Sequence, residues 1–262
     1  MGKLTGKTAV ITGGGTGIGR AIAKRFHEEG ASALICGRRP QKLEEAAKFI
    51  SPEGKRIHTV AADVTREDDI RRLIDEAVKV TGRLDILVNN AGFMRFAALE
   101  DVAPDEWDAM IAVNVTAPWR LMVHVLPHMR KAGSGSIINI SSIAGLKAFP
   151  GSGAYCTSKA ALQMVSQVMA MEAAKDNIRV NLIAPAVIEG TEIADPVYGP
   201  ENVAHDFYDR LRPLHPLGRN GRSEDVAEAA LFFASQSSSW VSGVILNVDG
   251  GRHLATNRPP EG

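Results

Sequence analysis

Tyr155 and Lys159 are four positions apart in the segment Tyr-Cys-Thr-Ser-Lys, and Ser142 lies thirteen positions before Tyr155. Positions i and i+4 of a helix share one face, so the phenol and the ammonium would point into the same space. An ammonium beside a phenol favours the phenolate, which lowers the pKa of the phenol and lets it exchange a proton near neutral pH. A serine hydroxyl beside them would hold a carbonyl or alcohol oxygen in place for that proton. The spacing Tyr-x-x-x-Lys is common by chance, so its surroundings must decide whether it marks a site.

Short apolar runs rich in Val, Ile and Leu alternate along the chain with longer amphipathic segments. Strands that alternate with helices of this length indicate crossover units, which build a parallel sheet. The runs are apolar throughout, as expected for strands covered on both faces. We therefore predict an α/β fold, a single Rossmann-like doubly wound domain over 1–262 with a parallel sheet of about seven strands and helices on both faces. The predicted strands are 8–12, 33–36, 57–61, 86–89, 136–140, 179–183 and 244–248, and the predicted helices are 19–29, 41–50, 67–80, 104–130, 154–175 and 223–234.

The composition is ordinary for a soluble globular protein, with 45% hydrophobic and 23% charged residues. Basic and acidic residues both number 30, so the formal net charge of zero gives no electrostatic reason to expect binding to nucleic acid or to an anionic membrane. No uninterrupted apolar run is as long as a membrane span, and the N-terminus has no signal-peptide core. Cys36 and Cys156 form neither a disulfide framework nor a metal-ligand pattern, so we expect free thiols and a cytoplasmic location.

A glycine-rich segment at 12–19, Thr-Gly-Gly-Gly-Thr-Gly-Ile-Gly, follows the first predicted strand and opens the first predicted helix. Glycines at this junction let the backbone turn tightly and approach a pyrophosphate, whose charge is favoured at a helix N-terminus. The spacing of Gly13, Gly17 and Gly19 differs from the common G-x-G-x-x-G fingerprint. The tripeptide Gly-Lys-Thr at 6–8 ends like a P-loop, but it precedes the strand and lacks the earlier glycine, so we exclude a nucleoside triphosphatase. The position of the glycine segment predicts dinucleotide binding.

The second predicted strand ends in Gly37-Arg38-Arg39, close to twenty residues after the glycine segment. A carboxylate at this point would bind the adenosine ribose hydroxyls of NAD and repel the 2′-phosphate of NADP. Gly37 removes that carboxylate, while Arg38, and with it Arg39, can bind the phosphate in a fork geometry. We therefore favour NADP(H) over NAD(H) as the cofactor.

Residues 192–221 interrupt the alternation of strands and helices. They contain four prolines, three aromatic residues and two histidines, His205 and His215. A long irregular segment in a compact domain is usually a lid, a binding loop or disorder, and the aromatic residues favour a substrate-binding loop. The two histidines either touch the substrate or lie exposed on the loop. The low-complexity end at 255–262 is predicted to be a flexible tail.

His124 and His128 are four positions apart in a predicted helix, a spacing that can chelate a metal. Pro127 lies between them and no acidic residue has the spacing of a zinc motif, so we predict no metal site. The predicted helix 154–175 is apolar around most of its circumference, which indicates burial. That burial is either within the chain or against a second subunit, so a homo-oligomer, tetramer or dimer, is one expectation.

The order and spacing of these motifs resemble the classical short-chain dehydrogenase/reductase family over nearly the whole chain. Several motifs in one order are more specific than any one of them, and the doubly wound sheet of that family agrees with the alternation described above. The landmarks are the glycine segment at 12–19, Asp63-Val64, Asn89-Asn90-Ala91-Gly92, Asn114, Ser142, Tyr155-x-x-x-Lys159 and Val248-Asp249-Gly250-Gly251.

The resemblance implies a role for each matched position. Tyr155 would be the general acid in carbonyl reduction and the base in alcohol oxidation, and Ser142 would hold the substrate oxygen. Lys159 would bind the nicotinamide ribose and, with the positive charge of the oxidised cofactor, depress the pKa of Tyr155. Asn114 would hold a water that relays protons to Lys159. The implied cofactor-binding residues are Gly13, Gly15, Thr16, Gly17, Ile18, Gly19, Arg38, Arg39, Asp63, Val64, Asn90, Ala91, Gly92, Tyr155, Lys159, Pro185, Ile188 and Thr191.

One segment departs from the family pattern. The Pro-Gly that usually follows the sixth strand is Pro185-Ala186 here, and Gly190 stands where a threonine is expected, with Thr191 next. Backbone contacts from this segment to the nicotinamide amide, at Ile188 for example, can remain, and Thr191 is the candidate for the displaced threonine contact. Alanine is less permissive than glycine wherever a positive φ is required.

We therefore expect reversible hydride transfer between the nicotinamide C4 of NADP(H) and a ketone or secondary alcohol, without a metal. Segments 93–96, 143–149 and 192–221 are expected to line the pocket, and their apolar and aromatic content suits a hydrophobic or cyclic substrate. Arg95 or Lys147 would meet an acidic group, or both side chains are solvated. The alternatives are reduction of 3-oxoacyl thioesters, a catalytically idle NADP(H)-binding sensor or scaffold, and an epimerase or dehydratase. The idle module predicts loss of a catalytic residue, and the epimerases and dehydratases usually need a longer C-terminal domain.

Overall fold

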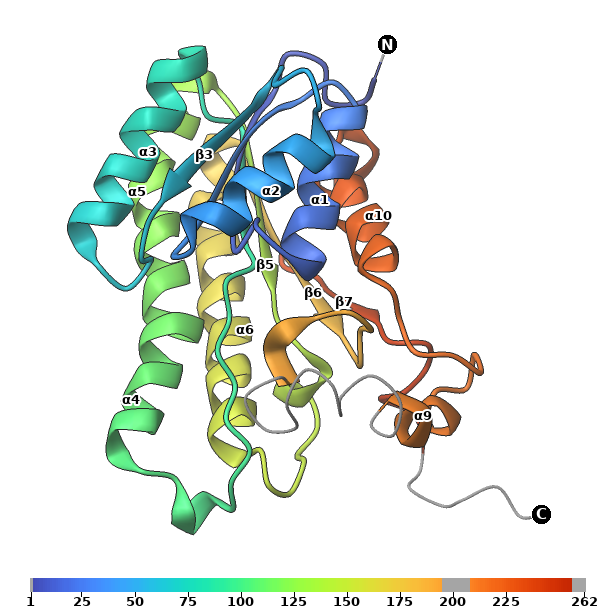
Figure 1. Cartoon of the computed structure of the whole chain (residues 1–262). Coiled ribbons are helices and arrows are strands. Elements are labelled where there is room, and N and C mark those ends of the chain that lie inside the picture. The colour runs from blue at the N-terminus through green and yellow to red at the C-terminus, as the bar shows by residue number, and fades with distance from the viewer. Residues whose placement is uncertain (1, 195–207, 256–262) are drawn as a thin grey trace.

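The computed structural model describes residues 2–194 and 208–255, and these residues are built around a seven-stranded parallel sheet (Figure 1). The order of the strands in the sheet is β3-β2-β1-β4-β5-β6-β7. The chain winds outward from β1 to β3, returns to the centre at β4 and then winds outward to β7 in the other direction. This reversal opens a crevice beside the carboxyl ends of β1 and β4. The strands are β1 (Thr8–Thr12), β2 (Ser32–Gly37), β3 (Ile57–Ala61), β4 (Ile86–Asn89), β5 (Gly135–Ile140), β6 (Ile178–Pro185) and β7 (Ile245–Val248).

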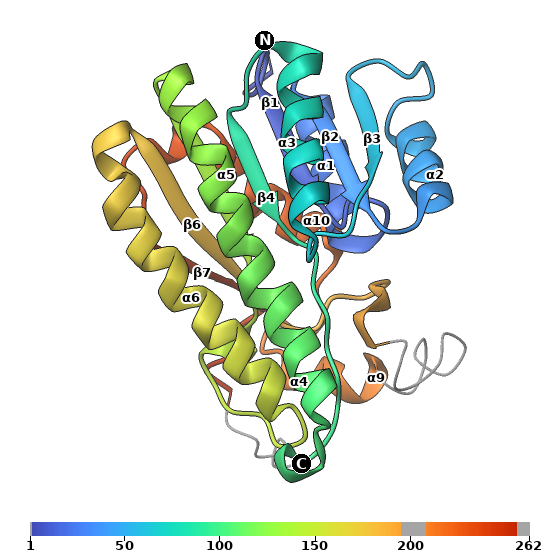
Figure 2. The same cartoon turned by 90° about the vertical axis from the view of Figure 1, so that its left-hand side faces the viewer.

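Helices cover both faces of the sheet (Figure 2). The helices α1 (Gly17–Glu28), α2 (Pro40–Ile50) and α10 (Ser223–Ala234) pack on one face, and α3 (Glu67–Thr81), α5 (Ala117–Ala132) and α6 (Gly153–Ala173) pack on the other. Two further helices, α4 (Pro104–Ile111) and α9 (Tyr208–Leu211), contribute residues to the cavity described below. Short 3₁₀ segments are Leu99–Asp101, Ile143–Gly145, Ala174–Asp176, Glu192–Ala194, Arg212–Leu214 and Gln236–Ser238.

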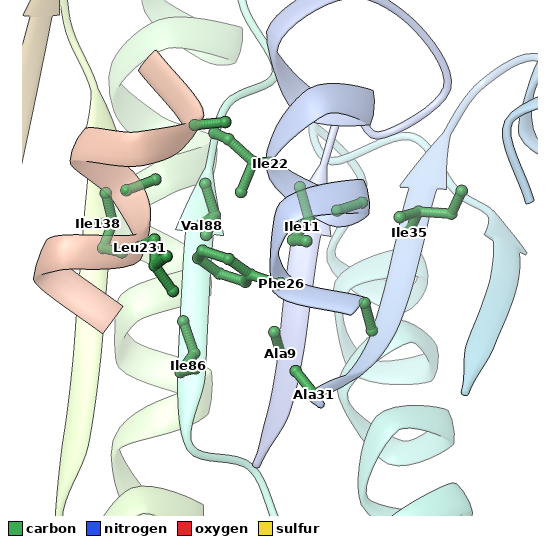
Figure 3. Packing of buried hydrophobic residues seen from close by; sticks show 14 of the residues in the cluster. Ala9, Ile11, Ile22, Phe26, Ala31, Ile35, Ile86, Val88, Ile138 and Leu231 are labelled. Atoms are coloured by element: carbon green, nitrogen blue, oxygen red, sulfur yellow. The ribbon is translucent and has the colours of Figure 1, made fainter. Parts of the chain in front are cut away.

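The alternation of side chains along β1 shows why two helical layers form. Ala9 and Ile11 belong to the apolar cluster beneath α1 and α10, whereas Val10 belongs to the cluster beneath α3 and α5. Successive residues of a strand point to opposite faces, so a strand that is apolar throughout needs a cover on each side. Figure 3 shows Phe26 of α1 and Leu231 of α10 against the strands of the sheet. The result is a rigid sheet whose carboxyl ends can hold side chains in fixed positions.

A continuous helical stretch of 29 residues runs from Pro104 to Ala132 and consists of α4, a π-helical turn (Ala112–Thr116) and α5. Its length and hydropathy would allow a membrane crossing, but its apolar residues Leu121, Val125 and Met129 are buried on the sheet, as in a core helix. The sequence predicted one helix over 104–130 and did not predict the π-helical turn within it. Such widened turns occur often at functional sites, and this one contains Asn114.

Every predicted strand and helix is present among the described residues, and no boundary moves by more than two positions. The predicted α/β doubly wound parallel sheet is therefore confirmed. The predicted substrate loop at 192–221 is described at 192–194 and 208–221, while its middle part lies outside the described residues, as does most of the predicted tail at 255–262.

Candidate active site

A cavity of about 1080 Å³ lies at the carboxyl ends of the strands, and residues that follow each of the seven strands contribute to its wall. Two of the predicted site residues, Gly19 and Asn114, do not line it. The predicted site residues that line it are Gly13, Gly15, Thr16, Gly17, Ile18, Arg38, Arg39, Asp63, Val64, Asn90, Ala91, Gly92, Ser142, Tyr155, Lys159, Pro185, Ile188 and Thr191. The fold thus gathers most of the predicted positions around one space.

The glycine segment turns directly from β1 into α1. Gly13 and Gly17 adopt positive φ values of 65° and 49°, which glycine tolerates best. Gly19 lies where α1 approaches the loop, and a Cβ there would be only 2.2 Å from the carbonyl oxygen of Gly13. Gly19 therefore serves close packing, as the third glycine of dinucleotide loops does.

The N-terminus of α1 is suited to an anion. Thr16 at the N-cap makes no side-chain hydrogen bond to the helix, and the first turn contains no acidic residue. The backbone amides of this turn are thus left for another acceptor, and the helix dipole favours negative charge there. The side chain of Asn90 fixes the loop by donating to the carbonyl oxygens of Thr12 and Gly13 at 2.9 and 3.2 Å. These features fit the pyrophosphate of a dinucleotide.

The two arginines after β2 differ in their surroundings, although both line the cavity. Arg39 forms an ion pair with Glu192, whose carboxylate also accepts a hydrogen bond from the Thr16 hydroxyl at 3.4 Å. Arg38 is exposed and has no ion pair with a residue in the described parts of the chain. The Arg39–Glu192 contact was not predicted, because 153 positions separate the two residues.

Tyr155, Lys159 and Ser142 meet at the end of β5, as their spacing predicted. Tyr155 and Lys159 are buried on α6, with the Lys159 Nζ 5.6 Å from the centre of the Tyr155 ring. The Lys159 Nζ donates to the carbonyl oxygen of Ile140 at 3.0 Å. Ser142, two residues further on, accepts a hydrogen bond from the Ala144 amide at 3.1 Å and makes a second one with the Tyr155 phenol. A phenol, a hydroxyl and an ammonium thus face one end of the cavity.

Burial dominates the proton affinity of both ionisable groups. It raises the pKa of Tyr155 to about 12, and the hydrogen bond with Ser142 offsets only part of the rise. Burial also lowers the pKa of Lys159 to about 8. The prediction that the neighbouring ammonium lowers the phenol pKa is therefore wrong for this structure, since the removal of the phenolate from water outweighs that attraction. Tyr155 is a protonated phenol at neutral pH.

Asn114 lies in the π-helical turn behind the cavity wall, where its side chain is fully buried. Its Oδ1 accepts from the Phe93 amide at 2.9 Å, and its Nδ2 donates to the Phe93 carbonyl at 2.7 Å and to the Ser158 hydroxyl at 3.0 Å. A Cβ added at Gly92 would lie 3.6 Å from the Asn114 Oδ1 and 3.8 Å from the Lys159 Nζ. Asn114 and Lys159 therefore flank the same point, as the implied proton relay requires.

The segment after β6, in which Ala186 replaces the usual glycine, adopts a backbone conformation that does not require glycine. Among the described non-glycine residues only Arg56 and Asn177 have a positive φ, so the position of Ala186 does not need a glycine. The Thr191 hydroxyl donates to the Ile188 carbonyl at 2.9 Å. The methyl of Thr191 is 3.4 Å from where a Cβ on Gly17 would lie, which places Thr191 directly against the glycine segment.

The histidines do not form the sites considered from the sequence. His215 is buried and does not line the cavity, and its Nδ1 is 2.9 Å from the Leu211 carbonyl oxygen, so it neither faces substrate nor lies exposed. His205 lies outside the described residues. The Nε2 of His124 is 2.8 Å from a carboxylate oxygen of Glu67. The residues that the structure describes contain no group of three His, Cys, Asp or Glu that could hold a metal.

The substrate end of the cavity is largely apolar. Phe93, Met94 and Phe149 pack beside Tyr155, and Tyr208 and Leu211 of α9 add to the lining. Each of the predicted pocket segments 93–96, 143–149 and 192–221 contributes to the wall. Ala109 of α4 and Val113 of the π-helical turn also line it and were not predicted, because they look like ordinary core residues of a helix.

Neither of the two cations considered for an acidic group, Arg95 and Lys147, faces the cavity. Arg95 is paired with Glu106 at 2.9 Å, Lys147 donates to the Ala255 carbonyl at 3.0 Å, and neither lines the cavity. Arg252 does line it. Arg252 directly follows the Val-Asp-Gly-Gly landmark, but a single arginine in a C-terminal turn forms no pattern by which it could have been found.

Comparison with known proteins agrees with this geometry. A family profile described as enoyl-(acyl carrier protein) reductase matches residues 13–253. The 3-oxoacyl-[acyl-carrier-protein] reductase FabG of Thermotoga maritima is 36% identical over 249 residues, which cover 95% of this chain and 98% of that protein. The 2-(S)-hydroxypropyl-CoM dehydrogenase 3 of Xanthobacter autotrophicus is 34% identical, with 95% and 97% covered. The crystal structure of a short-chain type dehydrogenase/reductase from Mycobacterium marinum superposes with a TM-score of 0.88 at 33% identity, with 95% and 96% covered.

Proposed function

Because this chain belongs to the classical short-chain dehydrogenase/reductase family and is an oxidoreductase of C–OH and C=O groups, we propose that it uses NADP(H) and that Tyr155 is its general acid and base. The substrate class is a ketone or secondary alcohol with an apolar body. The observation that carries the proposal is the convergence of Tyr155, Ser142 and Lys159 on the cavity that the glycine segment also lines.

Each residue has a defined task in carbonyl reduction. Ser142 donates a hydrogen bond to the substrate carbonyl oxygen and sets its position. Tyr155, protonated at neutral pH, donates its proton to that oxygen as the carbonyl carbon becomes the alcohol carbon. Lys159 stabilises the phenolate that is left and, beside Asn114, lies where a proton can return to it. The bound nicotinamide supplies the hydride in this direction and accepts it in the reverse one.

Substitution of Tyr155 by Phe tests this proposal. Loss of the proton donor should lower kcat for a reducible ketone by about 10²- to 10⁴-fold, while the dissociation constant for NADPH changes little. Tyr208→Phe is the matched control, since Tyr208 is a second tyrosine of the cavity wall but lies on α9. Full turnover in Tyr155→Phe, or an equal loss in both variants, would reject Tyr155 as the acid.

Reduction of 3-oxoacyl thioesters is the second candidate activity. It is favoured by the relatives named 3-oxoacyl-[acyl-carrier-protein] reductase, two of which are 36% and 38% identical to this chain. A panel of 3-oxoacyl thioesters and free ketones with both coenzymes separates the two. The idle sensor is disfavoured, because all four implied catalytic side chains are present, three of them on the cavity wall and Asn114 directly behind it.

We also propose a homo-oligomer. The buried face of α6 packs on the sheet, but Met164, Val168 and Met171 on the same helix are exposed, and so is Trp119 on neighbouring α5. An apolar surface of this kind is typical of an interface between subunits. Light scattering after gel filtration measures the state directly, and a monomer would reject the proposal. Both cysteines are free, which supports the reducing cytoplasm as the location.

A further inference from the structure

Arg252 lies at the end of the sheet's last strand, on the wall of the cavity that contains Tyr155. The chain leaves β7, turns at Asp249-Gly250-Gly251 and then presents Arg252, which is 8% exposed. Its guanidinium lies over the ring of Phe149, with the central carbon 5.9 Å from the ring centre. Phe149 in turn packs in the apolar cluster that includes Tyr155. Arg252 and the reacting end of the cavity are thus joined by one apolar wall.

The charge of Arg252 is not neutralised by any residue in the described ranges 2–194 and 208–255. Its Nη1 is buried and has no hydrogen-bond partner, and its side chain forms no ion pair there. The carboxylate of Asp249, three positions earlier, is held by His253 at 2.5 Å and by the Gly251 amide at 3.0 Å. Arginine stays charged in proteins, so Arg252 is a buried cation with no counterion among the residues that the structure describes. Such a group is unfavourable unless an anion reaches it from outside.

The acidic residues of the cavity wall are at the dinucleotide end. Asp63, after β3, binds the amide and hydroxyl of Thr65 at 3.0 and 2.8 Å, and Glu192 binds Arg39. Neither carboxylate is available to Arg252. The wall between Arg252 and Tyr155 is built from aromatic and aliphatic side chains. The part of the cavity near Tyr155 therefore combines a proton donor, an apolar wall that includes Phe149, and the cation of Arg252 on the other side of that ring.

We propose that Arg252 binds an anionic group of the substrate, so that the substrate of the proposed hydride transfer is an oxo acid or hydroxy acid, or an ester that bears a phosphate. This inference rests on the proposed function and narrows its substrate class. A planar guanidinium can bind two oxygens of a carboxylate or phosphate at once, which fixes the orientation of the substrate as well as holding it. Arg252 is thus a residue that determines specificity, while proton transfer stays with Tyr155.

Matched substrates test the proposal in the unaltered enzyme. Each free oxo acid is compared with its neutral primary amide at constant ionic strength, with NADPH as the reductant. Charge-assisted binding should give the acid a kcat/KM about 10- to 100-fold above that of the amide. Equal values for acid and amide across the series would exclude a carboxylate as the group that Arg252 binds, and together with equal values for the thioester pair described next they would overturn the proposal.

The source of the anion is distinguished by a second pair. A 3-oxoacyl coenzyme A thioester carries phosphates, whereas the N-acetylcysteamine thioester of the same acyl group is neutral. A preference for the coenzyme A thioester together with no preference for free acids assigns Arg252 to a phosphate. The reverse result assigns it to a carboxylate.

Variants of Arg252 then test whether this residue causes the preference for anionic substrates. Arg252→Met keeps the apolar stem and should lower kcat/KM about 10- to 100-fold for the anionic substrate, mainly through KM, with little change for the neutral one. Arg252→Lys should keep part of the preference because it keeps the charge without the fork. An equal loss on both substrates in Arg252→Met would mean a structural role and overturn the proposal. If neutral ketones are reduced in a Tyr155-dependent manner but neither free acids nor coenzyme A thioesters have an advantage over their neutral partners, only this inference fails. The absence of any turnover overturns the proposed function and this inference together.

Discussion

Removal of the charge on Arg38 should weaken the binding of NADPH much more than removal of the charge on Arg39. Both residues line the cavity after β2, and both were predicted to bind the 2′-phosphate. The structure separates them, because Arg39 is already paired with Glu192 while Arg38 has no ion pair with a described residue. A phosphate that recruits Arg39 must first break that pair.

The magnitudes follow from the exposure of these groups. A hydrogen bond to a charged group contributes about 1.5–3 kcal/mol, and the exposed position of Arg38 places it near the lower end. Arg38→Gln should therefore raise the dissociation constant of NADPH about 10-fold. The side chains of Arg39 and Glu192 are 57% and 40% exposed, so their pair contributes at most about 1 kcal/mol. Because Arg39 gives up that amount on binding, Arg39→Gln should weaken NADPH only about 2- to 3-fold.

The assay is a titration of the protein with NADPH and with NADH, followed by the fluorescence of the reduced nicotinamide. NADH is the internal control, since it lacks the 2′-phosphate and its affinity should stay within about 2-fold in every variant. Glu192→Gln should tighten NADPH, and in that background Arg39→Gln should have a larger effect than alone. Equal effects of Arg38→Gln and Arg39→Gln, or a parallel loss of NADH affinity, would refute this reasoning.

Two further predictions concern the stability of the frame around the site, and both are measured by urea unfolding at one protein concentration. A Cβ on Gly19 would lie 2.2 Å from the backbone oxygen of Gly13, so Gly19→Ala should lower the free energy of unfolding by about 1–3 kcal/mol. Gly15→Ala is the control, because a Cβ on Gly15 would have its nearest neighbour at 3.4 Å and should leave the free energy of unfolding nearly unchanged. Equal effects of the two substitutions would contradict the packing argument. Burial alone would raise the pKa of Asp85, but hydrogen bonds from Arg83 and two other donors outweigh it and hold the pKa below its usual value. The resulting stabilisation is fully present above the unfolded pKa of about 3.9 and is lost as the pH falls through the lower folded value, so Asp85→Asn should destabilise by about 1–2 kcal/mol at every pH from about 5 to 8. A difference that shrinks as the pH falls toward about 6 would contradict this assignment.

The sheet and most of the site were predictable because parallel strands covered on both faces are apolar along their whole length. Runs such as 86–89 and 136–140 could be located from that property alone, and the structure places strands there. Functional side chains then follow the carboxyl ends of strands, as Asn90 follows β4 and Ser142 follows β5. The position of these residues after strands, together with the order of the motifs, was sufficient to predict that they meet at one cavity.

Contacts between distant segments were not predictable, because neither periodicity nor spacing relates their positions. Glu192 reaches Arg39 from the segment after β6, although β1, β4 and β5 separate β6 from β2 in the sheet. The position of Arg252 in the cavity was likewise not predictable from the sequence. Its place in the cavity depends on β7 lying next to β6 at the sheet edge, with Val248 level with Pro185. A single charged residue in a turn gives no sign of this in the sequence.

Tyr155 shows that the position of a neighbouring charge does not by itself determine the pKa of a side chain. The four-residue spacing correctly predicted that Lys159 lies beside the phenol. The pKa nevertheless moves the other way, because Met110 and Ala144 pack around Tyr155 from two other segments and remove it from water. Desolvation is the largest effect on the pKa of Tyr155, and the hydrogen bond with Ser142 compensates for only part of it. The residues of this chain therefore keep Tyr155 protonated at neutral pH, which is the state that the proposed general acid requires.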